Sequence, residues 1–180
     1  AYPSGRARSL HVRELSARVR ARLRCADGVV GLLTPEEMGR TLAAAPDPEL
    51  ARVALSRVGE DPGARVTLGR ADVLPVAVRL LGFSREATDF LVRHPEETGA
   101  LADVRPRGRV ELDRELAEDV ERAGERDGLR RFRQRAMLRI AARDLGGDPL
   151  EDVVTEISHV AEACLTLSCR IAAPEDLAIV

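Results

Sequence analysis

Apolar residues recur three or four positions apart along most of the chain, which is the period of an amphipathic helix. The first such segment spans residues 10–24, where arginines separate the apolar positions. Its apolar side chains are Val12, Leu15, Val19 and Leu23. Asp27-Gly28 then interrupts the pattern, so we expect a first helix that ends before this pair.

Helix-start signals divide the next part of the chain into short helices. Thr34-Pro35-Glu36-Glu37 combines a capping threonine, a proline at the first helical position and a glutamate that completes a capping box. Asp47-Pro48 starts the following helix in the same way. Further short helices are predicted from about Pro75 to Gly82 and from the Ser84 cap to near His94, because Gly82 and Pro95 are natural stops.

Longer helices are predicted after a linker rich in Pro, Gly and Arg at residues 104–109. One is highly charged, the next is rich in arginine over residues 129–145, and the last opens at Asp148-Pro149. The last carries a wide apolar stripe, formed by Leu150, Val153, Val154, Ile157, Val160, Ala161, Cys164, Leu165 and Ile171. Because Ile157 and Leu165 lie on this stripe, we expect both to be buried. A short β-like run, Leu177-Ala178-Ile179-Val180, follows.

These patterns predict an all-α fold. Short helices in residues 1–104 precede a helical bundle or hairpin with a long C-terminal helix in residues 105–173. Residues 174–180 form a linker and the first strand of a further domain. With aromatic residues at only 2%, the core must be built from Leu, Val, Ala and Ile, which is typical of packed helices.

Composition excludes several classes of protein. Hydrophobic residues make up 44% and charged residues 32%, which fits neither a disordered chain nor a membrane-embedded one. All 28 basic residues are arginine, yet the net charge is −2, which argues against a general nucleic-acid binder. The three cysteines form no C-x-x-C pair and favour a reduced, cytoplasmic protein. The three histidines lie too far apart in sequence to suggest a metal site, so we predict no metal ligands. The sequence shows no Ser/His/Asp order, paired-carboxylate motif or phosphate loop, so we predict no catalytic residues either.

The arginine-rich helix is the sharpest candidate for a site. Arg135, Arg139 and Arg143 are four residues apart and therefore lie on one face. A row of guanidinium groups could hold phosphates or an acidic partner, so we expect an anion or interface site at which several of these arginines stay unpaired or face solvent in this segment. Two alternatives stay open: a solvated face, or pairing with the acidic residues of the preceding segment 111–125.

Three tracts of sequence carry a resemblance to a known family. They are LLGFSREATDFLVRHPE at residues 80–96, LRRFRQRAMLRIAARDL at 129–145 and LEDVVTEISHVAEACL at 150–165. In this order and spacing the chain resembles the helical segments of bifunctional glutamine synthetase adenylyltransferase/adenylyl-removing enzymes, over roughly residues 68–180. Arg143-Asp144-Leu145 is more similar to the first, adenylyl-removing half of that family than to the second.

The resemblance implies a non-catalytic helical part of a larger enzyme. The family's Gly-rich turn and Ser-Asp-x-Asp carboxylates would follow the strand that Leu177–Val180 begins, so no catalytic residue is carried over. The whole enzyme would use ATP and Mg²⁺ to attach AMP to glutamine synthetase and would remove it by phosphorolysis. A PII signalling protein and glutamine would set the direction of the reaction.

Two other classes of function compete with this interpretation. Residues 47–82 run helix, glycine turn, helix, glycine turn, as armadillo-like or HEAT-like interaction modules do. A helical nucleic-acid-binding domain would rest on Arg139 and its neighbours alone.

Overall fold

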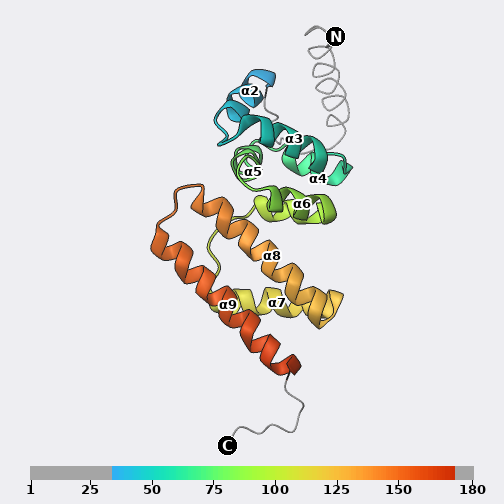
Figure 1. Ribbon diagram of the computed structural model, residues 1–180, viewed down its shortest axis with the longest axis vertical. Coiled ribbons are helices and arrows are strands. Elements are labelled where there is room, and N and C mark those ends of the chain that lie inside the picture. Colours follow the sequence, from blue (N-terminus) through green and yellow to red (C-terminus); the bar gives the residue numbers. More distant parts are fainter. Residues whose placement is uncertain (1–33, 173–180) are drawn as a thin grey trace, which may run out of the picture.

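The computed structural model describes residues 34–172, and in this part of the chain every regular element is a helix (Figure 1). The short helices are α2 (Pro35–Ala43), α3 (Pro48–Val58), α4 (Pro62–Leu68), α5 (Leu74–Leu81), α6 (Arg85–Arg93) and the 3₁₀ helix η1 (Pro95–Leu101). The long helices are α7 (Arg109–Ala123), α8 (Glu125–Asp144) and α9 (Leu150–Ala172). The all-α prediction is confirmed. The helix predicted at residues 10–24 and the β-like run at 177–180 lie outside the described residues.

The helix starts predicted at Thr34, Asp47 and Ser84 are confirmed at atomic detail. Thr34 Oγ accepts a hydrogen bond from the Glu37 amide at 3.2 Å, and a Glu37 carboxylate oxygen accepts one from the Thr34 amide at 2.7 Å, which completes the capping box. The side chains of Asp47 and Ser84 also accept hydrogen bonds from backbone N–H groups, at the starts of α3 and α6. Each cap satisfies backbone N–H groups that the helix itself leaves without partners, so these short helices begin at defined residues.

Helix α8 lies between the two main parts of the core (Figure 1). On one side Leu138 and Ala142 pack with α3–α6 and η1, around residues such as Leu81. On the other side Phe132 and its neighbours pack with α7 and α9. The proposed division into residues 1–104 and 105–173 stays a prediction, since α8 contributes side chains to both clusters.

Close packing of α7 on α8 depends on a glycine in the first turn of α8. A Cβ atom added to Gly128 would lie 2.6 Å from the carbonyl oxygen of Asp119 and 2.7 Å from the Cα of Val120. Both are backbone atoms of α7, so a side chain at this position would push the two helices apart. The same segment includes Gly124, whose φ of 80° connects α7 to α8 through a conformation that favours glycine.

The predicted burial of Ile157 and Leu165 is wrong. Ile157 is 37% exposed and Leu165 is 63% exposed. Helix α9 packs on α7 and α8 through a narrower stripe, formed by Val153, Glu156, Val160, Ala163 and Leu167. The apolar surface of α9 is wider than the contact that α7 and α8 make with it, so its outer half is left uncovered by the described residues.

Candidate functional site

The predicted arginine row lies on α8, and its three guanidinium groups turn into the protein. The side chains of Arg139 and Arg143 are each 3% exposed and that of Arg135 is 15% exposed. The reason is the position of α8, which is covered by η1 on one side and by α7 and α9 on the other. The spacing of four residues does place the three on one face, and that face is an inter-helix contact.

Arg135 is held by acidic residues from two other elements. Its Nη1 and Nη2 donate to the two carboxylate oxygens of Asp119 on α7, at 3.1 Å and 2.5 Å. Asp119 is 1% exposed and also accepts from Arg122 at 2.7 Å. Glu97 of η1 lies 3.4 Å from Arg135 Nη1 and accepts from Arg131 Nε at 2.8 Å. A bidentate pair of this kind fixes the direction of both side chains.

Arg139 and Arg143 share a buried carboxylate from α9. Arg139 Nη1 donates to Glu115 of α7 at 2.8 Å, and Arg143 Nε donates to Asp148 at 2.7 Å. Arg143 Nη1 also donates to Glu156, whose side chain is 3% exposed. The other oxygen of Glu156 lies 3.9 Å from Arg139 Nη2, and neither atom has a hydrogen-bond partner among the described residues.

The predicted anion or interface role required several of these guanidinium groups to stay unpaired or to face solvent, and that expectation is wrong. The alternative of internal pairing is the arrangement observed, with Glu115 and Asp119 from the predicted acidic segment as partners. Sequence reasoning missed the partners outside that segment, which are Glu97, Asp148 and Glu156. We call the whole set the α8 ion-pair network: Arg107, Arg122, Arg131, Arg135, Arg139 and Arg143 with Glu96, Glu97, Glu115, Asp119, Asp148 and Glu156.

Each guanidinium group of the α8 ion-pair network already pairs with at least one carboxylate, and Arg107 also reaches Asp103 and Glu111. A phosphate placed beside it would meet carboxylates as well as arginines.

Burial raises the pKa of Glu97, and the nearby Asp119 charge adds to this while Arg135 opposes it. At Glu115 burial acts in the same direction, but hydrogen bonds from Arg139 and Arg107 outweigh it and lower its pKa. Because its ion pairs join α8 to η1, α7 and α9, the network fixes how these three helices pack on α8.

Part of this network comes from the segment predicted to be a linker. Arg107 is 8% exposed, and its side chain donates to Asp103 at 2.9 Å and to Glu115 at 3.1 Å. It also donates to the Arg105 carbonyl at 2.9 Å. These contacts hold residues 103–107 against the start of α7. The sequence signal for these contacts was the spacing of Glu111 and Glu115, which follow Arg107 by four and eight residues.

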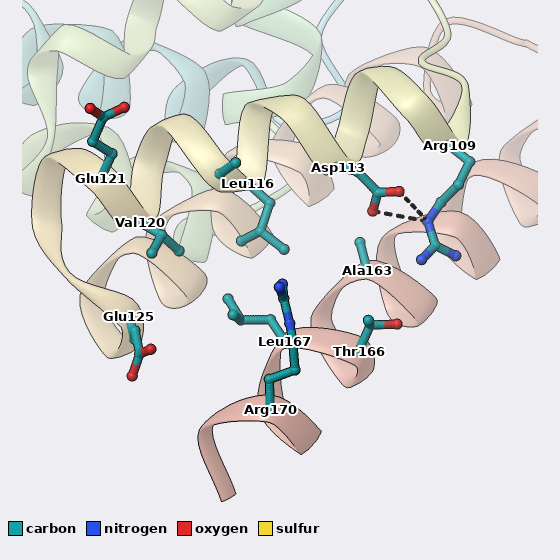
Figure 2. A pocket seen from close by; sticks show the side chains of 11 residues that line it. Arg109, Asp113, Leu116, Val120, Glu121, Glu125, Ala163, Thr166, Leu167 and Arg170 are labelled. Carbon is teal, nitrogen blue, oxygen red and sulfur yellow. Dashed lines mark hydrogen bonds and ion pairs between the residues drawn. The ribbon is translucent and has the colours of Figure 1, made fainter. Parts of the chain in front are cut away.

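A groove of about 640 Å³ lies between α7 and the C-terminal half of α9 (Figure 2). Its floor is apolar and includes Leu116, Val120, Ala163 and Leu167. Figure 2 shows the Arg170 side chain reaching up between the two helices, while Asp113 on the rim accepts from Arg109 Nε at 2.9 Å. An apolar floor with charged edges suits the packing of another segment better than acid–base chemistry.

The described residues show neither a metal centre nor a membrane span. Residues 34–172 contain no group of three His, Cys, Asp or Glu side chains placed to hold a metal ion. Across the same residues, none of the helices combines the length and the apolar character needed to cross a bilayer.

Comparisons with known proteins place the chain among relatives of one kind. A family model described as glutamate-ammonia ligase adenylyltransferase matches residues 76–179. A curated relative from Streptomyces avermitilis, the bifunctional glutamine synthetase adenylyltransferase/adenylyl-removing enzyme, is 38% identical over 156 residues. That alignment covers 77% of this chain and 15% of the relative, so the chain spans a small part of the relative's length. No solved structure matches.

Proposed function

The chain belongs to the glutamate-ammonia ligase adenylyltransferase family, and we propose that it is a non-catalytic helical part of an enzyme that attaches AMP to glutamine synthetase and removes it. The observation that carries this proposal is the family match over residues 76–179, which includes all of α7, α8 and α9. All residues of the α8 ion-pair network lie within the matched residues. Its role in the proposal is to fix α9, from which the chain continues toward the catalytic part.

The described residues do not fit the ATP and Mg²⁺ that the proposed enzyme would use. Mg²⁺ is bound by carboxylates and phosphates, and in residues 34–172 no three acidic or other ligand groups are placed for a metal ion. The guanidinium groups of Arg135, Arg139 and Arg143 are already paired with carboxylates. We therefore assign no step of the reaction to these residues, and we assign ATP and Mg²⁺ to another part of the enzyme.

Glutamine synthetase is the proposed target, a PII signalling protein the proposed regulator, and the cytoplasm the proposed location. The name of the Streptomyces avermitilis relative supports the first of these. We also propose that the chain comes from the first, adenylyl-removing half, which rests on the resemblance at Arg143-Asp144-Leu145.

The helical-repeat alternative is not favoured by the fold. Helices α3 to α6 have 7 to 11 residues, whereas α7, α8 and α9 have 15, 20 and 23 residues. The second part of the chain therefore does not repeat the unit that suggested an interaction module.

A chimeric enzyme tests the proposal. This chain replaces the matching segment of the Streptomyces avermitilis relative, and incorporation and release of radiolabelled AMP on glutamine synthetase are measured. We expect the chimera to retain both activities and the isolated chain, with ATP, Mg²⁺ and glutamine synthetase, to transfer no AMP. The proposal would be contradicted by a well-folded chimera that lacks both activities, or by AMP transfer from the isolated chain.

A further inference from the structure

Helix α9 presents a second apolar stripe that the described residues leave uncovered. Leu150, Val154, Ile157 and Leu165 are respectively 70%, 50%, 37% and 63% exposed, and Ala161 between them is also exposed. At 3.6 residues per turn these five positions share one side of the helix, about a third of a turn from the stripe that packs on α7 and α8. We call this second stripe the outer α9 face.

One edge of the outer α9 face is bordered by arginines of α8. Arg126, Arg130 and Arg133 are exposed and follow one another by four and three residues, so they share one side of α8. Burial raises the pKa of the Cys164 thiol on α9, and the nearby charge of Arg133 opposes this rise. Cys164 follows Ala161 by three residues and therefore borders the stripe. The exposed arginines of α8 thus lie beside the outer α9 face.

These arginines are not used by the α8 ion-pair network. Among residues 34–172, Arg126 and Arg133 form no ion pair, and Arg130 pairs only with Asp127, at 2.8 Å. Asp127 is itself exposed, and exposed pairs of this kind contribute little. Met137 follows Arg133 by one turn, is 37% exposed and extends the apolar surface onto α8. The result is an apolar strip with positive charge along one side.

The surroundings of this strip decide what kind of partner fits it. Apolar anchors suit the exposed leucines, valine and isoleucine, and carboxylates beside those anchors suit the arginine edge. A helix satisfies its own backbone hydrogen bonds, whereas a strand laid along α8 and α9 would find no free backbone groups to pair with. The opposite edge carries Glu151 and Glu162, which an anionic membrane surface would repel.

We propose that the outer α9 face, together with the exposed arginines of α8, docks an amphipathic helix of a partner protein. That helix carries aliphatic side chains on one face and Asp or Glu along the edge that lies above α8. The aliphatic side chains cover the stripe from Leu150 to Leu165, and the carboxylates pair with Arg133 and its two neighbours along α8.

A helical peptide tests this inference in the full chain without any enzyme assay, so its outcome is separate from that of the proposed function. The probe is a dye-labelled peptide of three heptads, about 32 Å long as a helix. Leucine occupies its a and d positions and glutamate both edges, so that either orientation places carboxylates above α8. A second peptide carries lysine in place of glutamate. In fluorescence anisotropy, the chain should bind the glutamate peptide saturably, and about tenfold or more tightly than the lysine peptide at low salt.

Substitutions on the chain show where the peptide binds. Leu165→Ser and Arg133→Glu should each weaken binding of the glutamate peptide by about tenfold or more. Arg133→Glu should also strengthen binding of the lysine peptide, which a loss of fold would not do. The matched controls are Val66→Ser on α4 and Arg114→Glu on α7, where the two side chains are 54% and 67% exposed. Both controls should leave binding unchanged.

Several results would overturn the proposal. They are the absence of saturable binding, equal binding of the two peptides, and binding that neither Leu165→Ser nor Arg133→Glu affects. Self-association of the chain that Leu165→Ser abolishes would overturn it in favour of a second copy on this face. Binding to phosphatidylserine vesicles that both changes weaken would do so in favour of a membrane. A well-folded chimera that does not bind the glutamate peptide would do so in favour of the rest of the enzyme covering this face.

Discussion

The sharpest prediction concerns Glu156, the buried carboxylate that α9 inserts between Arg139 and Arg143. Replacing it by leucine removes the negative charge and leaves two nearly buried guanidinium groups with fewer partners. Breaking a buried ion pair from one side costs about 3–5 kcal/mol, because the remaining charge is left uncompensated. Glu115 and Asp148 stay in place, so we expect the lower end, about 3 kcal/mol. For a chain of this size that corresponds to a fall of about 6–12 °C in melting temperature.

A double-mutant cycle separates the ion pair from simple loss of packing. Arg143→Met combined with Glu156→Leu removes both charges, and well-packed apolar replacements of buried pairs are often neutral or stabilising. The double variant should therefore be more stable than Glu156→Leu alone, with a coupling energy above about 1 kcal/mol in urea unfolding. Glu162→Leu is the matched control, because Glu162 lies on the same helix, is 60% exposed and pairs with Arg109. It should change the free energy of unfolding by less than about 1 kcal/mol. The reasoning fails if Glu156→Leu and Glu162→Leu have equal effects, or if the two changes of the cycle simply add.

Three further predictions use thermal or urea unfolding of the same chain. Gly128→Ala should destabilise the chain by about 1–3 kcal/mol or more, because the added Cβ meets the backbone of α7. At the control position Gly39 nothing lies within 4 Å, so Gly39→Ala should stabilise α2 by up to about 1 kcal/mol. Equal effects of the two changes would refute the close helix crossing. Phe132→Ala should cost about 3–5 kcal/mol, since Phe132 is fully buried, and a cost below about 1 kcal/mol would show that it is not in the core. The pKa of Glu115 is lowered in the folded state from 4.5, so its stabilising contribution is complete above pH 4.5 and is lost as the pH falls below that value. Glu115→Gln should therefore be less stable than the wild type at pH 7, and the difference in free energy of unfolding should shrink below pH 4.5. A difference that stays constant with pH would contradict the assignment.

Local signals in the sequence predicted the helices well because they act over a few residues. The Thr34 capping box, the Asp47 and Ser84 caps and the proline near the start of α5 each depend on neighbours within one turn. No tertiary contact is needed for these signals to work. For the same reason, they say little about which helix packs against which.

The partners of the arginine row could not be predicted in full, because they come from four separate parts of the chain. Glu97 is 38 residues from Arg135 in sequence, and nothing local indicates that η1 packs on α8. Glu156 did leave a signal that sequence reasoning overlooked. It lies three residues after Val153 and four before Val160, on the stripe that is buried. A carboxylate on a buried stripe needs a buried cation, and α8 carries the arginines that supply it.

The opposite error occurred at Ile157 and Leu165, where apolar character was taken as burial. The helical spacing of apolar residues does not by itself say how much of a wide apolar surface the rest of the chain can cover. The excess apolar width of α9 became visible only once α7 and α8 were placed.

Helix α8 has a consequence for how the protein unfolds. Leu138 and Ala142 of α8 belong to one core cluster, and Phe132 and Ile140 belong to the other. Loss of order in either cluster therefore removes packing contacts from α8, on which the other cluster also depends. Melting of the short helices would expose one flank of α8, and melting of α7 and α9 would leave the buried Arg139 without its carboxylate partners. We therefore expect the two halves to unfold in a single cooperative transition, for which the calorimetric and van't Hoff enthalpies should agree.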